Sequence, residues 1–323
     1  MDAPKNIHFN VPILFIIFNR PDTSRQTFNE IRKQKPKTLF VAADGPRSNR
    51  PDDKEKCAET REIIKQIDWE CNLKTCFRKD NIGCARNVAE AITWFFNEVE
   101  YGIILEDDII PHPDFFPYCA ELLERYKDNP QIAAINGYYK QGIVRNEASY
   151  FFRCNFSGWG WATWRRVWEE FDLYLDNYSY KELKEALHWA GFGWNDRQYK
   201  TDQFKLQKQQ KADSWDWQFT LLILKLHALV VTPNRNMVNN VGWGDTSSHF
   251  KGIKSQTKPV YPIMPLKHPE KIERIAEADL NLNPTITVTF PVINKPITVK
   301  NNFLWWTWRW FRRNFIAKPK YTR

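Results

Sequence analysis

The sequence predicts an α/β fold with a mostly parallel, doubly wound central sheet. Continuous apolar runs at residues 11–18, 38–43 and 103–105 are typical of strands buried on both faces. The segments between these runs carry helical spacing, as in Val88, Ile92, Phe95 and Val99. Strands that alternate with helical patterns favour a parallel sheet.

The remaining elements follow the same patterns along the chain. We expect further strands at 73–77, 132–135 and 229–232, and helices opening at Thr23 and near Thr163 and covering 57–67, 113–126 and 219–227. The Lys- and Gln-rich segment 194–212 predicts a mobile flap. Residues 285–290 and 297–299 are expected to pair as strands. We expect one domain over 1–250 and a C-terminal extension over 251–323.

Composition limits the function classes. The 323 residues are 42% hydrophobic, enough for a sizeable core, and the net charge of +9 favours an anionic partner such as a nucleotide, a phospholipid surface or nucleic acid. The 15 Trp residues exceed the needs of a core and are common where sugars, bases or membrane interfaces are touched.

Cysteine usage and the first residues predict a cytoplasmic protein. The six cysteines form no CxxC pair, residues 1–10 lack the apolar core of a signal peptide, and no run of about 18 apolar residues exists to span a bilayer. We therefore expect free thiols in a reducing compartment.

Polar residues follow three of the expected strands. They are Asn19 and Arg20, Asp44 and Gly45, and the acidic trio, defined as Glu106, Asp107 and Asp108. Ligands of doubly wound sheets gather beyond the carboxyl ends of the strands, so these residues are expected on one rim.

The acidic trio interrupts an apolar run, and ionised carboxylates are costly to bury without a positive partner. A divalent cation that bridges a diphosphate is one such partner, because hard oxygen ligands suit Mg²⁺ and Mn²⁺. We interpret the trio as the metal corner of a nucleotide-sugar site. The alternative is a solvated acidic turn after an edge strand.

Taken in order, these segments resemble nucleotide-sugar glycosyltransferases of the GT-A fold, and most of all the N-acetylglucosaminyltransferase I type and its bacterial relatives. The residues that carry the resemblance lie within 11–250: the strand ends above, the trio with Pro113-Asp114-Phe115-Phe116, Ser157-Gly158-Trp159-Gly160-Trp161, and Trp215-Asp216-Trp217. The resemblance implies a Rossmann-like sheet flanked by helices. The Glu-Asp-Asp form departs from a strict Asp-x-Asp motif, but the family resembled also uses it.

The resemblance also implies roles for single residues. Asp108 would bind Mn²⁺ or Mg²⁺ directly, Asp107 would touch the ribose or the waters of the metal, and Glu106 the sugar. Arg20 and Asp44 would hold the base and ribose of the donor, which is expected to be a UDP-sugar.

Asp216 would be the general base of an inverting transfer to a glycan or lipid-linked glycan. Asp213 is a rival base, and a helix N-cap is the structural alternative for Asp216. A late loop would supply His249 as a further metal ligand, although a loop histidine is more often a surface residue. Trp161 is expected to stack on the nucleotide sugar, with core packing as the alternative.

The C-terminal segment 303–315 mixes Trp, Phe and Arg, which indicates contact with a membrane surface or packing on the body of the protein. Nucleic acid is not expected, because no binding module is recognisable.

Two other functions stay open. A sugar-1-phosphate nucleotidyltransferase would need a Gly-rich basic loop after the first strand, which Asn19-Arg20-Pro21 is not; a non-catalytic, membrane-peripheral carbohydrate-binding protein would use the Trp residues for sugar and the carboxylates for a structural cation.

Overall fold

A computed structural model describes residues 9–139, 147–210, 214–242 and 259–279, together with the backbone of strands β11 (Ile286–Thr289) and β12 (Pro296–Val299). The chain divides into two compact units, Met1–Asp279 and Leu280–Arg323. In the second unit β11 and β12 pair antiparallel, which confirms the predicted pairing. The boundary predicted after residue 250 lies outside the described residues, and residues 259–279 belong to the first unit.

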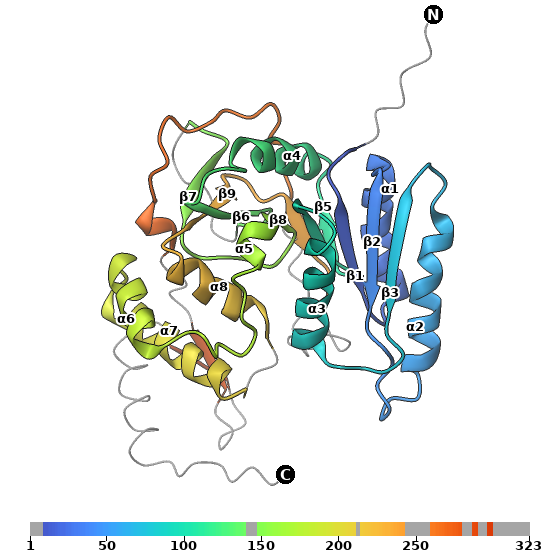
Figure 1. Ribbon diagram of the computed structural model, residues 1–323, viewed down its shortest axis with the longest axis horizontal. Coiled ribbons are helices and arrows are strands. Elements are labelled where there is room, and N and C mark those ends of the chain that lie inside the picture. Colours follow the sequence, from blue (N-terminus) through green and yellow to red (C-terminus); the bar gives the residue numbers. More distant parts are fainter. Residues whose placement is uncertain are drawn as a thin grey trace, which may run out of the picture. The chain divides into compact units, whose positions relative to one another are not determined.

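An eight-stranded mixed sheet forms the centre of the first unit (Figure 1). Its strands follow the order β3-β2-β1-β4-β8-β6-β9-β7. The first four in this order are mutually parallel, β8 is antiparallel to both of its neighbours, and β7 is an antiparallel edge strand. The bounds are β1 (Ile13–Ile17), β2 (Thr38–Ala43), β3 (Asn72–Phe77), β4 (Tyr101–Glu106), β6 (Ile132–Asn136), β7 (Tyr150–Arg153), β8 (Trp161–Trp164) and β9 (Leu229–Pro233).

Eight α-helices are described around this sheet (Figure 1). They are α1 (Pro21–Gln34), α2 (Asp53–Arg61), α3 (Cys84–Phe96), α4 (Phe115–Arg125), α5 (Arg165–Trp168), α6 (Tyr180–Trp189), α7 (Trp194–Lys208) and α8 (Asp216–Lys225). Two short 3-10 helices, η1 (Glu62–Gln66) and η2 (Ala276–Asp279), and a small antiparallel pair, β5 (Ile109–Pro111) with β10 (Val238–Asn240), complete the described elements. The predicted α/β class is therefore confirmed.

Burial explains why the apolar runs became central strands. Every residue of β1 is buried, and so are the four central residues of β4, because both strands have neighbours on each side. The amphipathic helix α3 buries Val88, Ile92 and Phe95 against this sheet. Burying a side chain of this size stabilises the fold by roughly 1.5–3 kcal/mol.

In the second half of the chain one prediction was wrong and one was incomplete. Most of the predicted flap 194–212 forms helix α7, whose Lys200, Phe204 and Gln207 are buried on one face. The helix predicted to begin near Thr163 begins at Arg165 as α5, but residues 161–164 before it form strand β8, which was not predicted. In both places tertiary packing overrides a weak local pattern.

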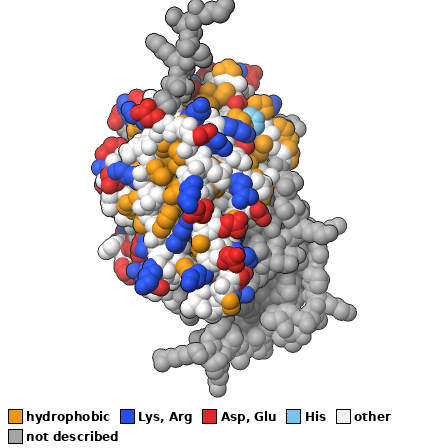
Figure 2. All heavy atoms as spheres, turned by 90° about the vertical axis from the view of Figure 1, so that its right-hand side faces the viewer, with side chains coloured by type: hydrophobic (Ala, Val, Ile, Leu, Met, Phe, Trp, Pro, Cys, Tyr) orange, Lys and Arg blue, Asp and Glu red, His pale blue; other side chains and the backbone are white. Residues whose placement is uncertain are grey.

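The excess positive charge is not gathered on the face that Figure 2 shows, which is the right-hand side of Figure 1. Lys and Arg side chains alternate there with Asp and Glu side chains. This face therefore lacks the uniform basic surface that non-specific binding to a polyanion would need.

Candidate functional site

The polar residues that follow β1, β2 and β4 lie at one edge of the sheet, as the sequence predicted. The parallel register pairs Ile17 of β1 with Ala43 of β2, and Ile16 with Glu106 of β4. Strand β6 runs in the same direction as β4, since β8 is antiparallel to both, so Asn136 ends at this edge too.

The acidic trio meets Arg20 at this edge. The Arg20 Nη1 atom lies 2.7 Å from the Asp108 Oδ2 atom and 3.5 Å from the Asp107 Oδ1 atom. The backbone N–H of Phe18 donates to Asp107 Oδ2 at 3.0 Å. Arg20 therefore lies on the predicted metal corner itself, and its contact with the donor base stays a prediction.

Burial and like charges perturb the trio. Burial raises the pKa of Asp107 to about 7, and the charge of Asp108 adds to this effect while Arg20 opposes it. The pKa of the half-buried Glu106 is raised well above its usual value, first by burial and then by Asp108, Asp107 and Asp216. Three carboxylates thus lie near one guanidinium group, so their negative charge is only partly compensated by the described residues.

The segment that follows β10 lies against Asp108. The backbone N–H of Val241 donates to the Asp108 carbonyl oxygen at 2.9 Å. At the next residue, Gly242, a Cβ atom would lie only 1.8 Å from Asp108 Oδ2, so a side chain there would displace the carboxylate. Sequence patterns do not indicate this contact, which the pairing of β5 with β10 reveals.

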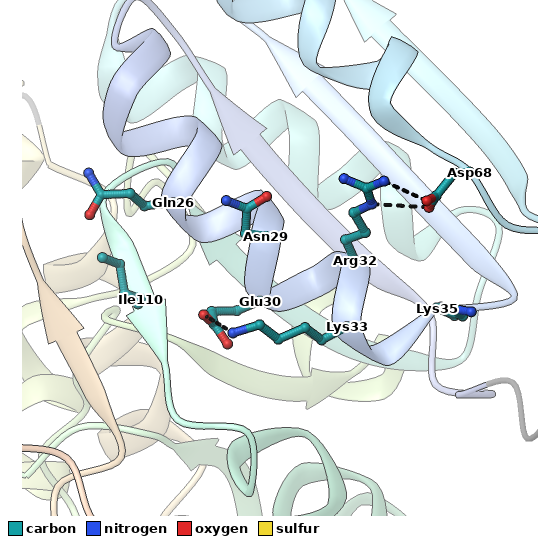
Figure 3. Close-up of a pocket in the computed structure, with 8 residues that line it drawn as sticks. All are labelled: Gln26, Asn29, Glu30, Arg32, Lys33, Lys35, Asp68 and Ile110. Carbon is teal, nitrogen blue, oxygen red and sulfur yellow. Dashed lines mark hydrogen bonds and ion pairs between the residues drawn. The ribbon is translucent and has the colours of Figure 1, made fainter.

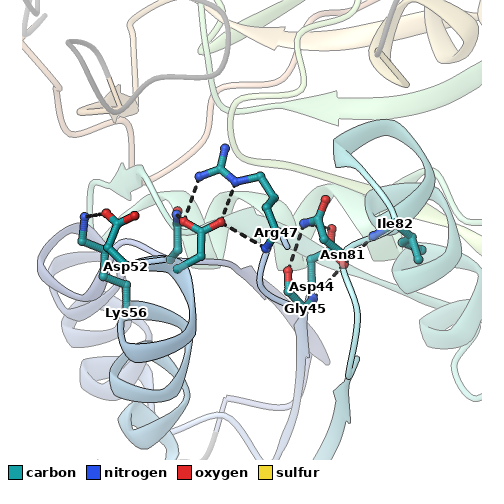
Figure 4. Close-up of polar contacts among 9 residues, drawn as sticks. Asp44, Gly45, Arg47, Asp52, Lys56, Asn81 and Ile82 are labelled. Atoms are coloured by element: carbon teal, nitrogen blue, oxygen red, sulfur yellow. Dashed lines mark hydrogen bonds and ion pairs between the residues drawn. The ribbon is translucent and has the colours of Figure 1, made fainter. Parts of the chain in front are cut away.

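Asp44 lies on the same edge but in a different environment (Figure 4). Its buried carboxylate accepts hydrogen bonds from the N–H of Gly45 at 2.8 Å, the side-chain amide of Asn81 at 2.8 Å and the N–H of Ile82 at 3.1 Å. Burial nevertheless raises the pKa of Asp44. The side chain ties the end of β2 to the loop before α3, and its contact with the donor ribose stays a prediction.

Asp53, the first residue of α2, joins the segments that follow β1 and β2. Figure 4 labels its partner Arg47. It accepts bonds from Asn19 Nδ2 at 2.7 Å and from the Arg47 guanidinium at 2.5 and 2.9 Å. The hydrogen bonds from Arg47 lower the pKa of Asp53 to about 2. Sequence patterns do not single out Asp53, because its partner Asn19 is distant in sequence and its partner Arg47 lies in an irregular segment.

Asp216 is an exposed carboxylate at the first position of α8. The preceding residue, Trp215, takes the N-cap position, so the N-cap alternative for Asp216 is wrong. Its Oδ1 atom accepts hydrogen bonds from the Ser214 hydroxyl and from the N–H of Trp217. The charge of Asp216 contributes to the raised pKa of Glu106, after burial, Asp108 and Asp107.

The two Trp-rich motifs meet beside Asp216. A Cβ atom at Gly158 would lie 3.0 Å from the Trp215 ring and 3.8 Å from the Asp216 Cβ atom, so the glycine permits this close approach. The Trp161 and Trp215 rings stack with their centroids 5.5 Å apart. Trp161 is fully buried in this aromatic cluster, so its predicted stacking on the nucleotide sugar was wrong and core packing accounts for it.

The described side chains alone do not form a complete site for a divalent cation. A bound ligand would have to supply further oxygen atoms. No three His, Cys, Asp or Glu side chains converge on one point within the described parts of the chain. A cation of the Mg²⁺ type needs only one or two carboxylates when substrate phosphates supply further oxygens, and the excess acidity around Asp108 meets that requirement. The predicted ligand His249 and the rival base Asp213 lie outside the described residues.

A separate hollow of about 540 Å³ lies along the outer side of α1 (Figure 3). Its cationic residues Arg32 and Lys33 pair with Asp68 and Glu30 respectively. None of the predicted site residues is among the described residues that line it. We therefore assign it no role in the site.

The comparison with protein families finds one matching family. A model described as the GNT-I family matches residues 3–177, which is slightly more than half of the chain. The match includes the acidic trio and Arg20 but ends before α6, α7 and α8. No curated protein sequence matches the chain.

Several solved structures are similar to the chain over part of its length. The mannosyltransferase PcManGT from Pyrobaculum calidifontis, solved in complex with GDP-Man and Mn²⁺, is 14% identical with a TM-score of 0.36, over 52% of this chain and 48% of that chain. The chain thus spans about half the length of that enzyme. The inositol-1-phosphate CTP transferase from T. maritima is 8% identical with a TM-score of 0.35, over 68% of this chain and 84% of that chain.

Proposed function

Since the chain belongs to the GNT-I family, we propose that it is a glycosyltransferase that moves a sugar from a nucleotide-diphosphate donor to a glycan or lipid-linked glycan. UDP-sugars are the expected donors, and inversion at the transferred carbon is the expected stereochemistry. The proposal places donor binding on the sheet edge that carries the acidic trio, and acceptor binding at the start of α8.

One observation carries this proposal: the Asp216 carboxylate lies within electrostatic reach of Glu106 although the two residues are 110 positions apart. Transfer of a sugar needs a site that holds a leaving diphosphate and a base that receives the acceptor proton, with the reacting carbon between them. The acidic trio would bind the cation that holds the diphosphate, and the exposed carboxylate of Asp216 would be the base.

On the donor side, Asp108 would hold the divalent cation, Mn²⁺ or Mg²⁺, and Glu106 would face the transferred sugar. When bound, such a cation neutralises the charge that develops on the departing diphosphate. Arg20 pairs with Asp107 and Asp108, and its charge opposes the rise in the pKa of Asp107. The hydrogen bonds that Asp44 accepts from Asn81 and Ile82 fix the edge of the sheet where the base and ribose would lie.

On the acceptor side, Asp216 would take the proton of the attacking hydroxyl. Both hydrogen bonds described for its carboxylate go to Oδ1, from Ser214 and Trp217. These bonds fix the orientation of the carboxylate, so Oδ2 is the atom that we propose as the base. A positioned base of this kind contributes typically about 10²–10⁴-fold to a rate.

The start of α1 argues against a sugar-1-phosphate nucleotidyltransferase. Only Phe18, Asn19 and Arg20 separate β1 from Pro21, where α1 begins. This connection has no glycine and is too short for a phosphate-cradling loop. The non-catalytic carbohydrate-binding protein remains the second candidate, favoured by the exposed aromatic side chains of α6 and α7.

A thermal-shift screen of nucleotide sugars with and without Mn²⁺ tests the proposal. A ligand at about 100 times its Kd stabilises the folded state by roughly 2.7 kcal/mol, which raises the Tm by several degrees for a chain of this size. We expect at least one nucleoside-diphosphate sugar to raise the Tm only when Mn²⁺ is present. Donors that give no shift, or the same shift without metal, contradict the proposal.

Donor hydrolysis then separates the two candidate functions. The wild-type enzyme is expected to release the nucleoside diphosphate slowly in the presence of Mn²⁺, whereas a binding protein releases none.

Other expectations lie beyond the described residues. Residues 303–315, expected to contact a membrane, are not described, and the cytoplasmic location and the absence of nucleic-acid binding stay predictions. No helix among the described residues meets the length and apolarity needed to cross a bilayer.

A further inference from the structure

Helix α7 lies outside the residues matched by the family model and packs against α8, which carries Asp216 (Figure 1). We propose that Tyr199 of α7 and Trp217 of α8 form an acceptor subsite that binds the pyranose ring of the acceptor sugar. This inference rests on the proposed function, because it takes Asp216 as the base that the acceptor hydroxyl must reach.

The two aromatic rings make a two-sided surface beside that base. Their centroids are 5.4 Å apart and their planes meet at 76°, an edge-to-face arrangement. Tyr199 keeps 38% of its surface exposed, and Trp217 is half-buried. Rings in this geometry offer apolar faces to the C–H groups of a sugar, while the phenol and indole N–H groups can bond its hydroxyls.

Tyr199 contacts the ring of Trp217, the residue that follows Asp216 in the chain. Burial raises the pKa of the Tyr199 hydroxyl, and the charge of Asp216 raises it further. The phenol therefore stays protonated across the physiological range and can donate a hydrogen bond to an acceptor oxygen. The carboxylate beside it can accept from the attacking hydroxyl, so one sugar would be held through both contacts.

The neighbouring residue, Lys200, keeps this part of α7 in place. It is buried, its Nζ atom donates to Asn155 Oδ1 at 2.8 Å, and it lies 5.7 Å from the centroid of the Trp217 ring. The backbone N–H of Asn155 is itself bonded to the buried carboxylate of Asp279 at 2.8 Å. Tyr199 therefore projects from a helix that is tied to the segment after β7 and, through it, to η2, as a preformed subsite requires.

Tyr180 of α6 provides a matched control. It is the same residue type with similar exposure, 41%, and it packs against Phe204 of α7 at a centroid distance of 6.3 Å. Lys184 and Lys205 lie over its ring. Removing the Tyr180 ring perturbs the packing of α7 without touching Asp216 or Trp217, so it reports a purely structural effect.

Saturation-transfer NMR with simple glycosides tests the subsite without relying on turnover. The probes are the methyl glycosides of mannose, galactose and N-acetylglucosamine, in the presence of UDP and Mg²⁺. We expect at least one to bind the wild-type protein, and Tyr199→Ala and Trp217→Ala to weaken its binding about threefold to tenfold. Tyr180→Ala is expected to bind like the wild type, and Tyr199→Phe to keep most of the affinity because the ring remains.

Two results would overturn the inference. One is that no glycoside of the panel binds the wild-type protein. The other is equal binding by the wild type and by folded Tyr199→Ala and Trp217→Ala. Failure of the proposed function has a different signature, since it appears as the loss of any Mn²⁺-dependent response to nucleotide sugars and leaves the glycoside measurement unaffected.

Discussion

Two groups of carboxylates occupy the same edge of the sheet and have opposite electrostatics. Asp53 has Asn19 and Arg47 as donors, and its pKa is lowered to about 2. Asp107 is buried beside two other acids with Arg20 as the only guanidinium partner described, and its pKa is raised to about 7. The residue type is the same, but burial is the largest cause of the raised pKa of Asp107, whereas hydrogen bonds from Arg47 are the largest cause of the lowered pKa of Asp53.

On the proposed function, this difference separates a structural carboxylate from one that takes part in ligand binding. Around Asp53, hydrogen-bond donors of the protein compensate the charge of the carboxylate, and the residue thereby connects two loops. Around the acidic trio the protein leaves negative charge uncompensated, a cost that persists where a ligand supplies the missing cation. The following changes test this distinction, beginning with the largest expected effect.

Replacing Asp108 by Asn should lower the rate of sugar transfer by roughly a thousandfold, since metal stabilisation of a leaving group amounts to several kcal/mol. The measurement is the release of nucleoside diphosphate at saturating Mn²⁺. Asp52→Asn is the control, because Asp52 is an exposed acid that pairs with Lys56 on the surface of α2. An Asp108→Asn enzyme with wild-type activity and metal dependence would remove the trio from the mechanism.

Replacing Asp216 by Asn should reduce kcat for transfer by about 10²–10³-fold, because the amide cannot take the acceptor proton. Binding of the nucleotide sugar with Mn²⁺, measured by thermal shift, should be unchanged. If donor binding falls together with kcat, Asp216 acts on the donor side and the division of the site into two parts is wrong.

Replacing Asp53 by Asn should destabilise the protein by about 1–2 kcal/mol at neutral pH. The folded pKa of about 2 lies below the ordinary value of 3.8, so this stabilisation is complete above pH 4 and is lost as the pH falls toward 2. The difference in unfolding free energy between wild type and variant, followed by urea denaturation, should shrink in acid. A pH-independent difference would show that the carboxylate charge is not responsible.

Replacing Asp107 by Asn should change the stability with the opposite pH dependence. The folded pKa of about 7 lies above 3.8, so in the presence of a chelator the wild type loses stability as the pH rises from 4 to 7. The variant lacks this titrating group, so its unfolding free energy relative to that of the wild type should increase as the pH rises from 4 to 7. Parallel stability curves for the two proteins would refute the raised pKa.

The sequence predicts the donor side of this molecule better than the acceptor side, for physical reasons. Central parallel strands are buried on both faces, so they stand out as apolar runs, and the direction of β1, β2 and β4 brings their polar ends to one edge. The partners of Asp44 could not be predicted, because Asn81 is 37 positions away and lies in an irregular loop.

On the acceptor side the local patterns are weak. Helix α7 buries Lys200, Thr201 and Gln207 beside a single phenylalanine, so its buried face is mostly polar and hides the helical period. Strand β8 has only four residues, and its place between β4 and β6 depends on contacts with both. The burial of Trp161 follows from that placement.

The position of a metal ion tests the central claim most directly. Crystals grown with UDP and Mn²⁺ would give an anomalous difference map at the manganese edge. The structure predicts one manganese peak about 2.1 Å from a carboxylate oxygen of Asp108, with the diphosphate of UDP among its other ligands. Clear density for UDP with no manganese at Asp108, and Arg20 still paired to that carboxylate, would contradict it.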